Sequence, residues 1–300
     1  MTPLETSIAL PAIDPLARIP IARRDWLRLM ADLGIRPNKG LSQHFLFERG
    51  LVERMVRLAG VSERDTVLEI GPGLGILTSE LLRKARSVVA VELDRTLAVH
   101  LRAAFDEVAG FRLVHGNALA LTNDELIPSG EPFEVVANLP YSVGTAILRH
   151  QLEQPRKPRR LSVMLQKEVA ERLTAQPPHM SVLGVATQFY AEPRLAFVVP
   201  PDAFIPPPKV ESAVVILDVR ETLPLPADLQ PLFFTIVNAG FRQKRKQVAN
   251  AIADVLRLPK AGIAAWLTTA GIDPMRRAET LSVAEWVTLT TSAPADVAAA

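Results

Sequence analysis

Residues 68–75 read Leu-Glu-Ile-Gly-Pro-Gly-Leu-Gly. The apolar residues that begin at Val67 predict a short buried strand, and those that follow the turn predict a helix. The glycines between them let a ligand approach the backbone closely, and the start of a helix offers free N–H groups. The stretch therefore predicts a strand, a turn and a helix, with a binding site at the turn.

The same alternation continues for about 150 residues. Strands are predicted at 67–70, 88–91, 111–114, 133–137 and 161–165, and helices at 74–83, 94–105, 144–152 and 167–173. Two later strands are predicted at 186–191 and 212–219, on either side of a proline-dense loop at 199–209. This order predicts right-handed βαβ units and a parallel sheet, which is an α/β fold.

The pattern changes on both sides of this region. We expect an N-terminal extension and helix over 1–37, with helical spacing at 25–33, then an α/β domain over 38–222 that includes a helix at 51–59. After Thr222 the strands stop, and helices are predicted at 232–239, 246–256, 262–270 and 283–289. We therefore expect a small all-helical domain over 223–291 and a frayed tail over 292–300.

The composition excludes several classes of protein. The 300 residues are 48% hydrophobic and contain no cysteine, which excludes disulfides, thiolate metal sites and cysteine nucleophiles and is typical of a cytosolic protein. No apolar run approaches the ~18–20 residues of a membrane span, and the N-terminus is a poor signal peptide. A net charge of +2 is too small to argue for nucleic-acid binding, so the distribution of basic residues matters more.

The glycine-rich turn is followed by an acidic residue at a sequence spacing that is informative about ligand binding. Glu92 ends the next predicted strand, 21 residues after Gly71, and an acid about 20 residues on can accept hydrogen bonds from a ribose diol. A dinucleotide needs G-x-G-x-x-G for its pyrophosphate, whereas here the third glycine comes one position early. S-adenosylmethionine has no phosphate and does not need that spacing, and Glu-Ile-Gly-Pro-Gly resembles the first motif of Rossmann-like methyltransferases.

Another predicted strand ends in Asn138-Leu139-Pro140-Tyr141. An amide and carbonyls can hold an exocyclic amine, and an aromatic face can stack on a base, so these residues suggest chemistry on the amino group of a nucleobase. The alternative is that Asn138 and Pro140 only end the strand and turn the chain.

Five motifs in order resemble the ribosomal RNA adenine dimethyltransferases. They are Ser42-Gln43-His44-Phe45-Leu46, the Gly71 turn, Asn138–Tyr141, the stretch Pro200–Ser212 that contains Phe204, and the C-terminal pair Phe241–Lys246 and Gly271–Glu279. The match is closer to the small-subunit, housekeeping branch than to the large-subunit, antibiotic-resistance branch.

The resemblance implies a Rossmann-like class I methyltransferase sheet with helices on both faces and a helical RNA-binding domain. It implies S-adenosylmethionine bound by His44, Leu46, Gly71, Gly73, Glu92, Asn117 and Asn138, with no metal. Related enzymes usually carry an acid where this chain has Asn117. The implied catalytic residues are Asn138, Leu139, Pro140, Tyr141 and Phe204, which would act on two adjacent adenosines in a hairpin near the 3′ end of small-subunit rRNA.

Two basic runs predict the RNA surface, although such runs also occur on ordinary solvated faces. They contribute Arg156, Lys157, Arg159 and Arg160, and then Arg242, Lys244, Arg245 and Lys246. We expect a cytoplasmic monomer whose partner is small-subunit rRNA or the immature small subunit. The alternatives are a large-subunit rRNA methyltransferase, a non-catalytic ribosome-assembly factor and a dinucleotide-dependent oxidoreductase.

Overall fold

The computed structural model describes residues 14, 17, 19–20, 22–35, 44–243 and 245–298, so Ser42, Gln43 and Lys244 lie outside the described residues. The chain divides into two compact units, and each is considered by itself. The first contains residues 1–140 and 202–208, and the second contains residues 141–201 and 209–300. The domain boundary after residue 222 stays a prediction.

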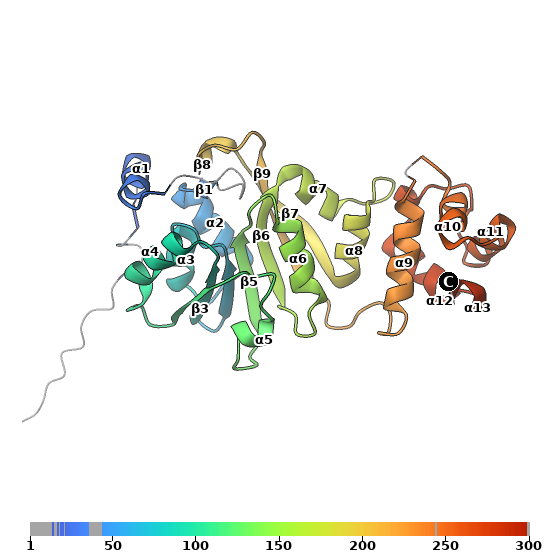
Figure 1. Cartoon of the computed structure of the whole chain (residues 1–300), viewed down its shortest axis with the longest axis horizontal. Helices are drawn as coiled ribbons and strands as arrows, with labels where there is room; N and C mark the ends of the chain where they lie inside the picture. The colour runs from blue at the N-terminus through green and yellow to red at the C-terminus, as the bar shows by residue number, and fades with distance from the viewer. Residues whose placement is uncertain are drawn as a thin grey trace, which may run out of the picture. The chain divides into compact units, whose positions relative to one another are not determined.

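The first unit is built on four parallel strands. Their order is β4-β3-β2-β5, with β2 at Thr66–Ile70, β3 at Ser87–Glu92, β4 at Phe111–His115 and β5 at Phe133–Asn138 (Figure 1). Every residue of β2 is buried, as is typical of a strand covered by helices. The predicted parallel sheet is confirmed, because the continuous apolar runs became its strands.

Some helices of this unit begin or end at recognisable capping residues. They are α1 (Arg23–Asp32), α2 (Arg49–Ala59), α3 (Ile76–Leu82), α4 (Arg95–Phe105) and the short α5 (Asn123–Leu126). Asp94 caps α4, since its carboxylate accepts hydrogen bonds from the N–H groups of Thr96 and Leu97. Gly60 ends α2 with a φ of 79°, a conformation that glycine adopts without strain.

A two-stranded ribbon that the sequence did not predict joins two of the motifs. Strand β1 (Phe45–Leu46) pairs antiparallel with β8 (Phe204–Ile205), and Figure 1 labels them next to one another. Beyond the strands, His44 Nδ1 lies 2.8 Å from the carbonyl oxygen of Pro206. The segment that contains His44 is therefore held against the proline-dense loop.

The second unit contains three antiparallel strands in the order β6-β9-β7. These are β6 (Arg160–Gln166), β9 (Ser212–Val219) and β7 (Ala191–Val199). Proline is tolerated at position 193 because β7 lies at the edge of this order and pairs only with β9.

The predicted strand at 186–191 is wrong, because residues 182–190 form helix α8 (Val182–Tyr190). Its apolar run is rich in residues that favour strands. Ser181, however, caps the helix through the N–H of Gly184, and Phe189 is fully buried against Phe233 of α9. Packing on the helices thus outweighed local propensity.

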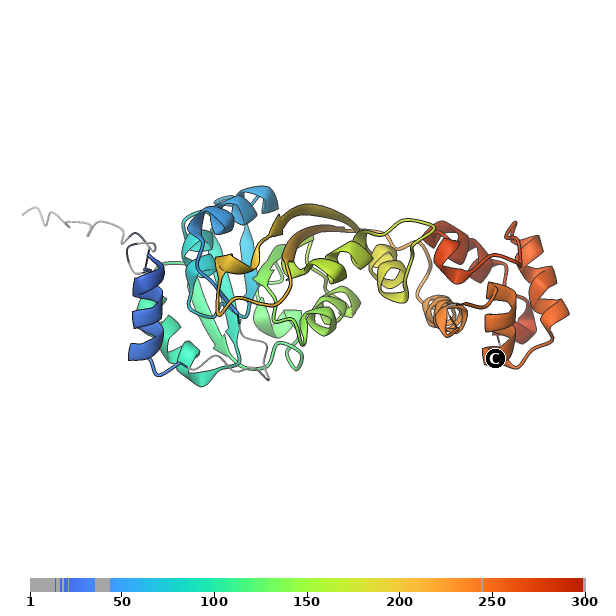
Figure 2. The same ribbon diagram turned by 90° about the horizontal axis from the view of Figure 1, so that it is seen from above.

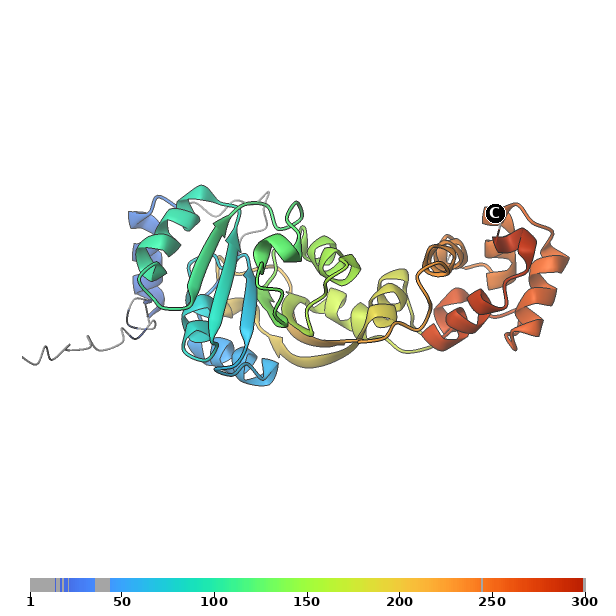
Figure 3. The ribbon, with the colours of Figure 1, turned by 90° about the horizontal axis from the view of Figure 1, so that it is seen from below.

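The remaining elements of this unit are helical. They are α6 (Gly144–Glu153), α7 (Lys167–Thr174), α9 (Gln230–Phe241), α10 (Val248–Leu256), α11 (Lys260–Thr269), α12 (Val283–Thr291) and α13 (Ala295–Ala298), with 3-10 turns η3 (Pro201–Ala203) and η4 (Ala278–Thr280). Helices α9–α12, orange to red in Figures 2 and 3, lie together, as predicted for an all-helical C-terminal part. The predicted frayed tail over 292–300 is wrong at residues 295–298, because α13 forms there and buries Val297. Gly240 lets α9 approach α12 closely, since a Cβ there would lie 2.5 Å from the Trp286 ring.

Candidate cofactor and base site

The predicted cofactor residues lie at the same edge of the parallel strands. The N–H of Gly71 donates to the carbonyl of Val91 (3.0 Å), and the N–H of Gly116 donates to the carbonyl of Glu92 (2.9 Å). These bonds align the strand ends that carry Gly71, Glu92 and Asn117. Strand β5 runs parallel to β2 and ends at Asn138. All four of these residues therefore lie at the carboxyl edge of the strands, where ligands bind in α/β sheets.

The glycine turn approaches two other motifs closely. Gly71 and Gly73 have φ values of 71° and 59°, which side-chain-bearing residues rarely adopt. A Cβ on Gly71 would lie 3.8 Å from Pro140 Cδ and 4.0 Å from the Asn138 carbonyl oxygen. A Cβ on Gly73 would lie 3.2 Å from the ring of Phe45. The glycine turn therefore packs close to both the Asn138 motif and the segment next to His44.

Glu92 is held rigidly beneath this turn. Its carboxylate is only 5% exposed and accepts hydrogen bonds from the backbone N–H groups of Gly73 (3.1 Å) and Asp94 (2.8 Å). Burial raises the pKa of Glu92, and these two bonds partly offset the effect. A carboxylate can accept about four hydrogen bonds, so a ligand hydroxyl can still be accommodated.

Asn138 ends β5 with its side-chain amide available. The side chain is half-buried and makes no hydrogen bond with any residue that the structure describes. Leu139 is buried at 2% exposure, whereas Pro140 is half-buried. The motif thus offers a side-chain amide at the strand end, where the Asn138 carbonyl and Pro140 lie close to the glycine turn.

Asn117 follows β4 and is exposed. Its Oδ1 accepts a hydrogen bond from the backbone N–H of Leu119 at 3.0 Å, which closes a local turn. The side-chain nitrogen makes no bond among the described residues. Asn117 therefore combines a structural role with a free NH₂ group that carries two donors, but it supplies no negative charge.

Two aromatic residues were predicted to hold the target base. In the second unit, Tyr141 is half-buried and its hydroxyl hydrogen-bonds to Ser212 Oγ. Burial raises the pKa of Tyr141, so the phenol stays protonated at neutral pH. In the first unit, Phe204 lies in β8 and is 1% exposed. A base can reach the Phe204 ring only if the surrounding segment moves.

The first basic run is largely engaged within the protein. Lys157 Nζ donates to the carbonyl of Gln154 (2.8 Å) and lies 5.9 Å from the Tyr190 ring centre. Arg160 forms an ion pair with Asp218 at 2.6 Å. Arg159 is exposed and Arg156 is half-exposed. Arg159 is therefore the most exposed of the four.

The second basic run lines a cleft. A hollow of about 340 Å³ is lined by Arg245, Lys246, Gln247, Asn250 and Lys260. Lys246 also forms an ion pair with Asp254 at 2.8 Å, which balances one of the three positive charges. Arg242 is exposed nearby in the sequence. Sequence reasoning missed Lys260, because a single lysine at a helix start carries no motif.

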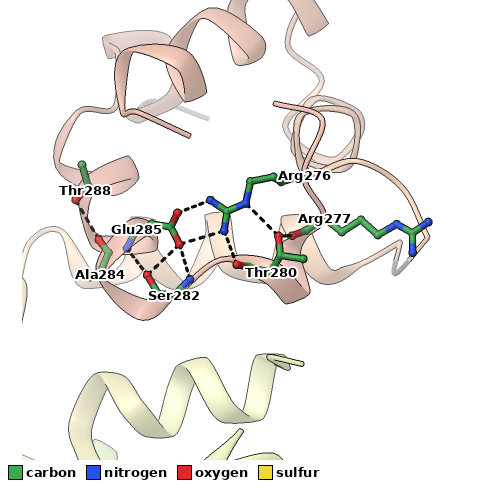
Figure 4. A network of polar contacts seen from close by, with 7 residues as sticks. All are labelled: Arg276, Arg277, Thr280, Ser282, Ala284, Glu285 and Thr288. Atoms are coloured by element: carbon green, nitrogen blue, oxygen red, sulfur yellow. Dashed lines mark hydrogen bonds and ion pairs between the residues drawn. The ribbon is translucent and has the colours of Figure 1, made fainter. Parts of the chain in front are cut away.

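The C-terminal motif is stabilised by one arginine (Figure 4). Arg276 donates to the Glu285 carboxylate and to the carbonyl and hydroxyl of Thr280, and Glu285 in turn accepts from Ser282. The carbonyl of Arg277, its neighbour, accepts a hydrogen bond from the Thr280 hydroxyl, whereas the Arg277 side chain points away from this network and is exposed. The network ties the turn after Gly271 to the start of α12 and leaves Arg277 at the surface.

Sequence reasoning also missed Glu69, a carboxyl inside the apolar run of β2. The side chain is 1% exposed, and neither oxygen has a hydrogen-bond partner of ordinary geometry among the described residues. Burial raises the pKa of Glu69 to about 8; the nearby Thr78 hydroxyl lowers it and the Glu92 charge raises it further. A glutamate in a run of Val, Leu and Ile was the available signal.

A family model described as ribosomal RNA adenine dimethylase matches residues 34–293. Proteins named ribosomal RNA small subunit methyltransferase A are similar along most of their length. The one from Dehalococcoides mccartyi is 42% identical over 86% of this chain and 89% of its own, and the one from Clostridium perfringens is 40% identical over 86% and 91%.

Solved structures share the fold. The 23S rRNA methyltransferase ErmE has a TM-score of 0.68 and 27% identity, covering 83% of this chain and 98% of its own. A dimethyladenosine transferase from Plasmodium falciparum also has a TM-score of 0.68, at 22% identity, covering 82% and 96%. Within the described residues, no helix has the length and apolar character needed to cross a membrane.

Proposed function

Because the chain belongs to the family of ribosomal RNA adenine dimethylases, we propose that it methylates the N6 amine of adenosines in ribosomal RNA. The single observation that carries this proposal is the placement of Asn138: its backbone carbonyl lies beside the glycine turn, and its side-chain amide makes no hydrogen bond with a described residue. The reaction would use S-adenosylmethionine twice on each amine, and its product would be N6,N6-dimethyladenosine.

The small ribosomal subunit is the better candidate substrate. Relatives named for the small subunit are 39–42% identical to this chain, whereas the 23S methyltransferase is 27% identical. We therefore propose that the targets are two adjacent adenosines in a hairpin near the 3′ end of small-subunit rRNA. The protein would act on the immature subunit, as a monomer in the cytoplasm.

The cofactor residues fit S-adenosylmethionine better than a dinucleotide. The close approach of Gly71 and Gly73 to their neighbours leaves backbone rather than side chains at the turn, and the third glycine is misplaced for a pyrophosphate. Glu92 would accept hydrogen bonds from the ribose hydroxyls, and Asn117 would contact the adenine. His44 and Leu46 would cover the cofactor. When bound, S-adenosylmethionine supplies a methyl group on a positively charged sulfur.

Asn138 would orient the target amine. Its side-chain oxygen, with the carbonyl of Leu139 or Pro140, would accept both N6 protons and hold them out of the plane of the base. The N6 lone pair is normally delocalised into the ring, so this geometry localises it toward the methyl donor. Alignment of two reactants can supply much of a rate enhancement, so no dedicated general base is required. The proton lost from the amine passes to solvent.

The aromatic residues would hold the base outside its stack. Tyr141 would stack on one face, and Phe204 would pack against the other after a shift of its segment. Each contact would contribute about 1–3 kcal/mol to base binding. The protonated Tyr141 phenol cannot serve as a base, which favours the stacking role.

Basic side chains would hold the RNA backbone. Arg156, Lys157, Arg159 and Arg160 form one group, and Arg242, Lys244, Arg245 and Lys246 form the other, which Lys260 extends. Because these groups would displace counterions from phosphates, the affinity for RNA should fall as salt rises.

The test uses methyl-labelled S-adenosylmethionine and either small or large subunits that lack the modification. After digestion, label in N6,N6-dimethyladenosine from small subunits alone supports the proposal. Label from large subunits alone assigns the chain to the other branch. No label, with cofactor binding measured separately, would favour a non-catalytic assembly factor.

A further inference from the structure

The hydroxyl of Tyr141 has a fixed partner within its own unit. It hydrogen-bonds to Oγ of Ser212, which is fully buried. Ser212 is the first residue of β9 and is paired on both sides, with Gln166 of β6 and Val199 of β7. A serine held in the middle strand of three cannot move without disturbing both neighbours, so it offers the tyrosine a rigid anchor.

We propose that Ser212 is a positioning residue that fixes the plane of the Tyr141 ring for stacking on the target base. The ring is attached to the backbone directly after Pro140 at one end, and the hydroxyl is anchored at the other. With both ends held, the ring cannot sample other rotamers, so the base meets a preorganised surface. The inference rests on the proposed stacking role of Tyr141.

This role explains why the stacking residue is tyrosine. A phenylalanine would offer the same face, and a phenol that stays protonated brings no acid–base chemistry at neutral pH. What the hydroxyl adds is the bond to Ser212. Loss of either partner removes this hydrogen bond and with it the anchor of the ring.

A double-mutant cycle tests the proposal. The variants are Tyr141→Phe, Ser212→Ala and the combination, assayed for single-turnover methyl transfer to unmodified small subunits at saturating S-adenosylmethionine. We expect each single change to slow transfer by about 2- to 12-fold, the effect of one hydrogen bond, and the combination to be no slower than Ser212→Ala. S-adenosylhomocysteine affinity should change less than twofold.

Ser162→Ala is the matched control, because Ser162 is a buried serine of β6 whose hydroxyl has no partner among the described residues. Its transfer rate should be unchanged. The positioning role would be overturned if the rate losses of the two single variants multiplied in the combined variant. It would also be overturned if Ser212→Ala had a lower melting temperature but an unchanged transfer rate. If Ser212→Ala fails to fold, an unchanged rate in Tyr141→Phe overturns it as well. An inactive parent protein would instead reject the proposed function.

Discussion

Asn138 and Glu69 show how differently two polar side chains can be used in neighbouring strands. Asn138 lies at the open end of β5 with its amide free, whereas Glu69 lies within β2 with both oxygens buried. A free amide at a strand end can bind a ligand without first breaking a hydrogen bond within the protein. A buried carboxyl without partners destabilises the charged form, so its effect appears in the pH dependence of stability.

Asn138→Ala should reduce the rate of methyl transfer by at least about 100-fold. The reason is that the N–H groups of the N6 amine lose the side-chain oxygen that would accept their hydrogen bond. S-adenosylhomocysteine affinity, measured by calorimetry, should stay within a few-fold of the parent. Asn117→Ala is the complementary variant and should weaken cofactor affinity while leaving the transfer rate at saturation nearly intact. Full activity in Asn138→Ala would refute the assigned role.

Glu69 should make the protein less stable as pH rises. Its folded-state pKa of about 8 lies above the ordinary value of 4.5, so the folded state binds a proton more tightly than the unfolded state between these values. The free energy of unfolding should fall as pH rises from 4.5 to 8. At about 1.4 kcal/mol per pH unit, the upper bound on this loss is roughly 5 kcal/mol.

Urea unfolding at pH 5, 6.5 and 8 checks this, with each variant compared to the parent. Glu69→Gln should remove the decline and be the more stable protein at pH 8. Glu125→Gln is the control: hydrogen bonds from Thr122 lower the pKa of Glu125, so it contributes stability above pH 4.5 that is lost only as pH falls below that value. An unchanged decline in Glu69→Gln would show that another group causes it.

Two of the three glycines in the turn between β2 and α3 face different surroundings. Gly73 faces the Phe45 ring of β1, next to the proposed cofactor contacts. Gly75 faces the core, where a Cβ would lie 2.7 Å from Phe105 and 3.2 Å from Leu101. Both have positive φ, so an added side chain is strained at either position.

Alanine at these two positions should separate binding from stability. Gly73→Ala should weaken S-adenosylhomocysteine binding by about tenfold or more, equivalent to ~1.4 kcal/mol, because Phe45 must move away. Gly75→Ala should lower the free energy of unfolding by about 2–4 kcal/mol, since strain adds to a core clash. Calorimetry measures the S-adenosylhomocysteine affinity, and urea unfolding measures the free energy of unfolding. If Gly73→Ala and Gly75→Ala changed both quantities equally, the separation of binding from stability would be contradicted.

The sequence predicted those elements whose pattern is local. Strands β2 to β6 were visible as apolar runs, and α2 ended at Gly60 as expected. Helix α8 was mistaken for a strand, because its apolar run lacks a polar face when helices cover it. Strands β1 and β8 have two residues each and exist only because distant segments pair, which no local pattern records.

The candidate site was predictable to a similar extent. Glycines, Glu92 and Asn138 stood out because each follows a predicted strand, and parallel strands end at one edge. Ser212 and Lys260 did not stand out, since their importance depends on what the fold brings against them.

Over the whole molecule, charge is nearly balanced yet unevenly distributed. The chain has 34 basic and 32 acidic residues, but Arg245, Lys246 and Lys260 share one cleft. Asp254 forms an ion pair with Lys246 there. Net charge therefore says little about RNA binding, whereas this local group of cations predicts phosphate contacts.

Arg245→Ala should weaken small-subunit binding uniformly and reduce the slope of log affinity against log salt by about one. Binding titrations at several salt concentrations measure this slope. Lys84→Ala, which removes an exposed lysine from the first unit, should leave it unchanged. Equal slopes for the parent and Arg245→Ala would remove the cleft from the RNA surface.

The most direct measurement is the nucleoside composition of small-subunit rRNA after exhaustive incubation with S-adenosylmethionine and this protein, determined by mass spectrometry on subunits that began unmodified. We expect two N6,N6-dimethyladenosines per subunit, formed by the parent and not by Asn138→Ala. Unmodified adenosine throughout, or methylation equally strong with Asn138→Ala, would contradict it.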